Sequence, residues 1–155
     1  MRFVRWTVPL LALTCGFASQ ASTQERRLKR TDLPAAVQKT ADQESQGATV
    51  RGYSRETEGG QIEYEVAMTV RGHNRDVTIA ADGSVLEIEE VVALDSLPAS
   101  VQAGLRQLAG SGKITKVESL TKHGALVAYE AQVRTGTKRS EVQVAPDGKP
   151  LAHPE

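Results

Sequence analysis

The residue types that could support chemistry in this chain are three histidines, the serines and several closely spaced glutamates. His73, His123 and His153 lack the short spacing that places two metal ligands on one helix or strand. No serine lies in a Gly-x-Ser-x-Gly motif, and no glycine-rich phosphate-binding loop occurs in the sequence. We therefore expect a protein that is not an enzyme, with no catalytic residues, no metal site and no cofactor.

The glutamates form two alternating pairs, Glu63 with Glu65 and Glu87 with Glu89. Alternate residues of a strand point to the same side, so the two pairs could make one carboxylate patch on a sheet. Such a patch is either the solvated face of a half-covered sheet or a contact surface for a basic partner. A calcium site is less favoured, because an open sheet rarely brings enough oxygen atoms together.

The elements that must position these glutamates are strands joined by short turns. Apolar residues alternate with polar ones from Ile62 to Val70, which indicates a half-buried strand. Asp82-Gly83 and Asp147-Gly148 predict hairpin turns, since glycine readily adopts the positive φ that these turns need. Further strands are expected at 48–54, 75–80, 84–92, 113–120, 127–133 and 140–145, with a stub at 149–151.

The chain contains an internal repeat. Residues 33–38 (LPAAVQ) return as residues 97–102 (LPASVQ), and residues 77–83 (VTIAADG) return as residues 142–148 (VQVAPDG). Tyr64-Glu65 likewise returns as Tyr129-Glu130. The matched segments keep the same order in both copies, so we infer a duplication.

Each copy begins with a short amphipathic helix. Apolar residues recur at helical spacing in Leu33 and Val37, and again in Leu97, Val101, Leu105 and Leu108, all of which we expect in the core. The predicted fold class is α+β: two tandem repeats, residues 32–93 and 94–155, each with one helix packed on an antiparallel three- to four-stranded meander. The meanders should join or abut in a curved sheet with both helices on one side.

An N-terminal segment precedes the repeats. Arg2 and Arg5 stand before an apolar run that ends in small residues, which predicts a signal peptide over residues 1–21 and a periplasmic or secreted protein. A lipid-anchored Cys15 is disfavoured, because Thr14 precedes it. The run is too short to span a membrane. Residues 22–31 form a basic tail, which we expect to be solvated and poorly ordered.

Composition argues against nucleic acid as the main partner and against disulfide bonds. The 19 basic residues balance the 19 acidic ones, which argues against nucleic acid as the main partner. Cys15 is the single cysteine and falls within the expected signal peptide, so the mature chain should have no disulfide. Its stability must then come from packing.

The Leu-Pro-x-x-Val-Gln helix, the Tyr-Glu strand and the Asp-Gly hairpin together resemble the PepSY and PepSY-like domains of secreted bacterial proteins. Two such units in tandem are similar in architecture to the β-lactamase-inhibitor protein. The resemblance covers about residues 32–151 and implies a non-enzymatic domain that binds proteins, with protease inhibition known in the family. No catalytic residues are implied.

We therefore expect a PepSY-like binding module whose partner is a protein such as an envelope or secreted protease, inhibited or regulated in trans. The alternative is an envelope sensor that binds a small ligand or cation between the two repeats. A partly exposed tyrosine is a common interface anchor, so we expect Tyr53 to share the contact surface with the acidic residues and the hairpin tips at 55–60 and 71–74. The candidate protein-binding residues are Tyr53, Arg55, Glu63, Glu65, Arg71, His73, Glu87 and Glu89.

Overall fold

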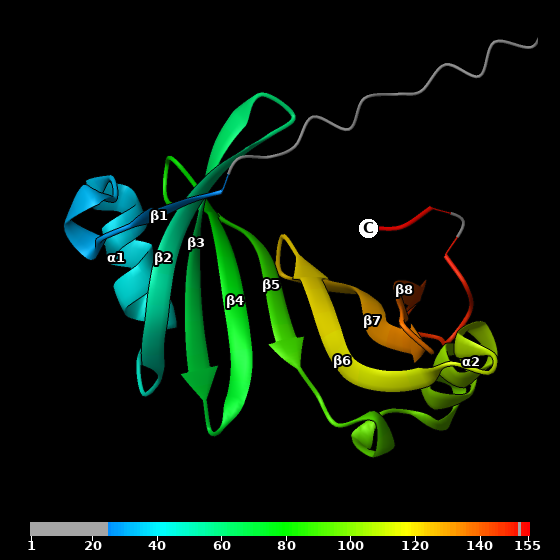
Figure 1. Cartoon of the computed structure of the whole chain (residues 1–155). Coiled ribbons are helices and arrows are strands. Elements are labelled where there is room, and N and C mark those ends of the chain that lie inside the picture. Colours follow the sequence, from blue (N-terminus) through cyan, green and yellow to red (C-terminus); the bar gives the residue numbers. More distant parts are fainter. Residues whose placement is uncertain (1–24, 152) are drawn as a thin grey trace, which may run out of the picture.

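The computed structural model describes residues 25–151 and 153–155, so the expected signal peptide lies outside the described residues. The described residues form an α+β fold with two helices and one eight-stranded antiparallel sheet. Figure 1 shows the curved sheet with α1 against one end and α2 against the other.

The first half of the chain supplies one helix and five strands. They are β1 (Arg26–Leu28), α1 (Ala35–Glu44), β2 (Thr49–Glu58), β3 (Gln61–Val70), β4 (His73–Ala80) and β5 (Val85–Val91). The second half supplies α2 (Ala99–Ala109), β6 (Lys113–Lys122), β7 (Ala125–Thr135) and β8 (Lys138–Val144). A short 3-10 turn precedes each helix, at Arg30–Asp32 and at Leu94–Ser96.

The strand order in the sheet follows the chain, from β1 to β8. Neighbouring strands are joined by tight turns except at β1–β2 and β5–β6, which α1 and α2 separate in sequence. These two strands pair from Glu87 opposite Lys122 to Val91 opposite Glu118. This pairing makes one continuous sheet from the two halves of the chain, and the expected stub at 149–151 is reduced to a single bridge between Val144 and Pro150.

Two apolar clusters hold the helices on the sheet. In the first, Val37 and Ala41 of α1 pack with Val66, Met68 and Ile79. In the second, Val101 and Leu105 of α2 pack with Val117, Ala131 and Val144. Leu108, which the helical spacing placed in the core, is instead 37% exposed, because it lies in the last turn of α2 beyond the edge of this cluster.

Both helices cover the same face of the sheet. Directly opposed residues in a sheet point to the same side, and the pairs Val66–Val77 and Val77–Ile88 place the first cluster on one face. The opposed pairs Ile88–Thr121 and Ser119–Tyr129 extend this face into the second half of the chain. The second cluster therefore lies on the same face as the first. The opposite face carries neither helix.

The basic segment before the first helix is ordered, contrary to the expectation of a solvated tail. Arg26–Leu28 form the edge strand β1, which pairs with β2 through residues 53–55. The Arg30 guanidinium then binds the Asp42 carboxylate on α1. Backbone pairing and this ion pair together hold the segment against the sheet.

No helix within the described ranges has the length and hydrophobicity that a membrane crossing requires. Cys15 is the only cysteine of the chain, so the chain has no internal disulfide. The fold therefore relies on its two packed clusters and on the sheet hydrogen bonds.

Candidate functional site

The helix-free face of the sheet is hollowed and strongly acidic. Glu63 and Glu65 of β3 lie on it together with Glu87 and Glu89 of β5, and all four line one cavity of about 280 Å³. The other carboxylates that line it are Glu56, Glu58, Asp76, Glu130 and Glu155. Lys122 is the one basic residue among the described residues of this lining. We call this region the acidic cavity.

The sheet register places carboxylates directly opposite one another. Glu56 of β2 faces Glu63 of β3, and Asp76 of β4 faces Glu89 of β5. Farther along the same face, Glu118 of β6 faces Glu130 of β7. Like charges in directly opposed positions destabilise a sheet, by roughly 0.2–1 kcal/mol for each pair. Repulsion between these carboxylates thus destabilises the sheet. A face with no role beyond contact with water could avoid this repulsion by placing positive side chains opposite negative ones.

Glu89 occupies the most crowded position of the acidic cavity. The pKa of its carboxyl is raised to about 7, mainly by burial and in addition by the neighbouring carboxylates of Glu118, Glu87 and Glu130. Its opposite neighbour on β6 is the buried Leu120, which offers no hydrogen bond. Glu89 is therefore partly protonated near neutral pH.

Burial also raises the pKa of five other carboxyls that line the acidic cavity. The groups affected in this way are Glu63, Glu65, Asp76, Glu87 and Glu130. For Asp76, burial outweighs the opposing effect of Arg51, which forms an ion pair with it at 2.7 Å. The cavity thus holds more negative charge than its own cations neutralise.

The cations near the acidic cavity are engaged within the chain. Lys116 Nζ lies 2.5 Å from the carboxylate of the buried Glu118. Lys122 Nζ lies 3.7 Å from the carboxylate of Glu155. The Gln143 amide donates a hydrogen bond of 2.8 Å to Glu130.

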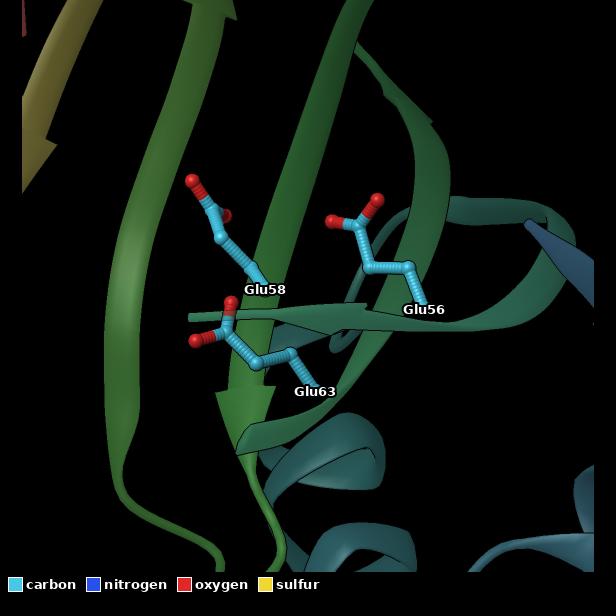
Figure 2. A group of neighbouring side chains, drawn as sticks. All are labelled: Glu56, Glu58 and Glu63. Carbon is cyan, nitrogen blue, oxygen red and sulfur yellow. The ribbon is translucent and has the colours of Figure 1, made fainter. Parts of the chain in front are cut away.

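A tighter group of carboxylates stands at the β2–β3 hairpin. One oxygen each from Glu56, Glu58 and Glu63 lies within 4.8 Å of the others, and Figure 2 shows the three side chains extending to the same side of the hairpin. Three such oxygens could contribute to a site for a hard cation, but calcium takes six to eight oxygen ligands. All three come from a single hairpin, so this group lies to one side of the junction between the halves of the chain.

The structure corrects the placement of Tyr53 and separates it from the acidic residues. A β-bulge at Arg51 shifts the register, so that Tyr53 stands opposite Val66 and packs on the cluster under α1. Arg55 stands opposite Tyr64 and therefore lies on the same helix-covered face. The side chains of Tyr53 and Arg55 thus point to the helix-covered face.

Arg71 and His73 are exposed, but they lie at the β3–β4 turn. Val70 pairs with His73 at this end of β3, whereas Glu63 pairs with Ala80 at the other. Arg71 and His73 are therefore remote from the acidic cavity. His123 lies in the β6–β7 turn, and within the described ranges the one group of residues with metal-ligand geometry contains no histidine.

Several residues that complete the acidic cavity are not among the candidates that the sequence pattern indicated. Glu56, Asp76 and Glu130 each alternate with inward-facing residues on their own strands, so their face could have been inferred strand by strand. What the pattern could not supply was the pairing of β5 with β6. That pairing is what brings Glu130 onto the same face as Glu89.

Comparison with known proteins adds to the description of the fold. No family model matches the chain, and no curated protein matches it significantly. A BLIP-like protein from Bacteroides fragilis NCTC 9343 superimposes with a TM-score of 0.60 at 18% identity, over 77% of this chain and 83% of the other. A DUF2874 family protein from Bacteroides ovatus ATCC 8483 gives a TM-score of 0.62 at 17% identity, over 77% and 84%.

A third solved structure is a protein from Bacteroides eggerthii DSM 20697 whose name places it provisionally in the periplasm. It superimposes with a TM-score of 0.64 at 17% identity, over 77% of this chain and 86% of the other. Similarity at this level of identity concerns the fold alone. The α+β fold of this chain is therefore similar to the folds of the BLIP-like protein, the DUF2874 family protein and the B. eggerthii protein.

Proposed function

We propose that this chain is a non-catalytic, periplasmic or secreted binding protein, built from two PepSY-like repeats. Its acidic cavity docks a basic segment of a partner protein, of which an envelope or secreted protease is one example. The observation that carries the proposal is the row of directly opposed carboxylates on the helix-free face. A basic partner side chain placed between two such carboxylates removes their repulsion and forms charge-assisted hydrogen bonds.

The shape of the face supports the same conclusion. The carboxylates line a hollow of about 280 Å³ in a curved sheet, which suits an inserted segment better than a flat contact. The helix-covered face, by contrast, is occupied by α1 and α2. An extracytoplasmic location agrees with the expected signal peptide and with the compartment named for the similar B. eggerthii protein.

The test compares capture of a partner from an envelope extract by three tagged baits. The first is the native protein, and the second carries Glu63→Gln, Glu65→Gln and Glu87→Gln. These substitutions keep the side-chain shape and relieve repulsion, so the second bait should fold at least as stably as the native protein. The third bait, Asp95→Lys with Gln107→Lys, makes the same change in net charge at exposed positions outside the acidic cavity.

We expect one protein to bind the native and third baits stoichiometrically, and to bind the second at least about tenfold more weakly. Equal capture by all three baits would place the interface elsewhere. If no bait captures a protein, the binding function fails, and calorimetric titration of the native protein with CaCl₂ tests the alternative of a cation sensor. A stoichiometric heat of binding that is lost in the second bait would favour that alternative.

A further inference from the structure

The helix-free face has a second hollow whose charge is opposite to that of the acidic cavity. It has a volume of about 660 Å³ and is lined by residues of β6, β7 and β8, among them Lys116, Gln132, Arg134 and Arg139. Glu130, Gln132 and Arg134 are alternate residues of β7 and so share one face. We call this second hollow the basic hollow.

Cations stand opposite one another in the basic hollow, as carboxylates do in the acidic cavity. Within the lining, Arg134 of β7 faces Arg139 of β8, and on its other side Arg134 faces Lys113 of β6, which lies outside the lining. Arg134 Nε donates a hydrogen bond of 3.0 Å to the Gly136 carbonyl, which fixes the side chain without neutralising it. Within the described part of the chain, neither arginine forms an ion pair at 4.0 Å or less.

The chemistry of the basic hollow suits a carboxylate. Arginine presents a planar set of donors that matches the two oxygens of a carboxylate, and two arginines side by side can share one such group. The exposed Glu141 is the one acidic residue among the described residues that line the hollow. An incoming carboxylate would therefore relieve the repulsion between Arg134 and Arg139.

We propose that the basic hollow binds an acidic side chain of the same partner segment whose basic side chain enters the acidic cavity. The inference rests on the proposed function and adds a charge pattern to the partner. Glu130 and Arg134 are four residues apart on β7, which corresponds to about 13 Å along a strand. An extended partner segment that runs along β7 would thus carry its acidic residue four positions from its basic residue.

The test uses three fluorescent peptides of equal length and measures their affinity by fluorescence anisotropy at low salt. The first carries two lysines followed, four positions later, by two glutamates. The second has the same composition with lysine and glutamate alternating, and the third has glutamine in place of glutamate. We expect the first peptide to bind the native protein at least about fivefold more tightly than either of the others.

The matched variants are Arg134→Glu with Arg139→Glu, and Lys39→Glu with Arg106→Glu. Both make the same change in net charge, and Lys39 and Arg106 are exposed on the two helices. The first variant should lose the preference for the first peptide and keep its affinity for the glutamine peptide within about twofold. The second variant should keep the preference. Equal affinity of the native protein for the first two peptides would overturn the inference.

Failure of the proposed function gives a different result. If the glutamine peptide, which keeps only lysines as charged residues, does not bind the native protein, then the acidic cavity does not dock basic segments. A glutamate-only peptide then tests the basic hollow by itself. Binding that is lost in Arg134→Glu with Arg139→Glu supports the anion site without the acidic cavity, and equal binding to both proteins overturns it.

Discussion

Glu89 is the residue in which burial and charge repulsion combine most strongly. Asp76 faces it from β4, the buried Leu120 faces it from β6, and Glu87 and Glu130 line the same cavity. Lys116 is the cation that acts on its pKa, and Lys116 is itself paired with Glu118. The result is a carboxyl whose pKa of about 7 lies well above its ordinary value of 4.5.

This raised pKa predicts that the protein loses stability as the pH rises. The folded state holds the Glu89 proton more tightly than the unfolded state does, so its contribution is fully present below about pH 4.5 and is lost as the pH rises through about 7. Glu89→Gln should stabilise the protein at pH 8 by about 1–2 kcal/mol, allowing for solvent screening, and have little effect at pH 4.5. Urea unfolding at both pH values measures the difference.

Asp95→Asn is the control for this prediction, because Asp95 is exposed in the 3-10 turn before α2. It should change the free energy of unfolding equally at both pH values. If Glu89→Gln has the same effect at pH 4.5 and pH 8, the burial of Glu89 among other carboxylates does not change the free energy of unfolding.

At the scale of elements, each helix contacts the hairpin turn that follows the third long strand of its own half. Thr40 of α1 donates a hydrogen bond of 2.6 Å to the Gly83 carbonyl. The matching position on α2 is Gly104, and a Cβ built there would lie 2.1 Å from the Gly148 carbonyl oxygen. The second half thus replaces a side-chain hydrogen bond with a direct approach of helix backbone to turn backbone.

Gly104→Ala should therefore destabilise the protein even though alanine favours helices. The gain in helix propensity is about 1 kcal/mol, whereas forcing α2 away from the turn should cost more, giving a net loss of about 1–3 kcal/mol. Gly52→Ala is the matched control, because a Cβ at Gly52 meets no atom within 4 Å and its φ is not positive. Thermal unfolding compares the two, and a Gly104→Ala protein as stable as the native one would contradict this packing.

At the scale of the whole molecule, the helix-free face is divided into an acidic cavity and a basic hollow, each with like charges in opposed positions. Two separate apolar clusters stabilise the halves, and the β5–β6 pairing joins them. The face therefore depends on packing beneath it rather than on its own charge pairs. Its electrostatic contribution to folding is unfavourable on both sides of the β5–β6 junction.

Salt should accordingly stabilise the free protein. Added NaCl screens repulsion between partly exposed like charges, since the Debye length falls from about 30 Å at 0.01 M to about 10 Å at 0.1 M. We expect the melting temperature at pH 8 to rise by several degrees over this range. The variant with Glu63→Gln, Glu65→Gln and Glu87→Gln should show a smaller rise, and a melting temperature that falls with salt in the native protein would contradict the prediction.

Much of the local structure follows from sequence pattern. The alternation from Ile62 to Val70 and the Asp-Gly turns predicted β3 and two hairpin turns, because side-chain parity and positive φ are properties of a few neighbouring residues. Parity also placed Glu63 with Glu65 and Glu87 with Glu89. Tyr53 lies on the helix-covered face instead of beside these glutamates, because the β-bulge at Arg51 adds one residue and reverses the face of every residue after it.

The sequence pattern thus indicated the helices, most of the strands and the sign of charge on individual strands, but it missed the edge strand β1. Only the tertiary structure decided that β5 pairs with β6, because these strands are separated by α2 and their register depends on packing between distant segments. That single pairing extends the acidic cavity across both halves and places the basic hollow on the same face. The sequence decides which residues are charged, and the long-range pairing of β5 with β6 brings those residues together on one surface.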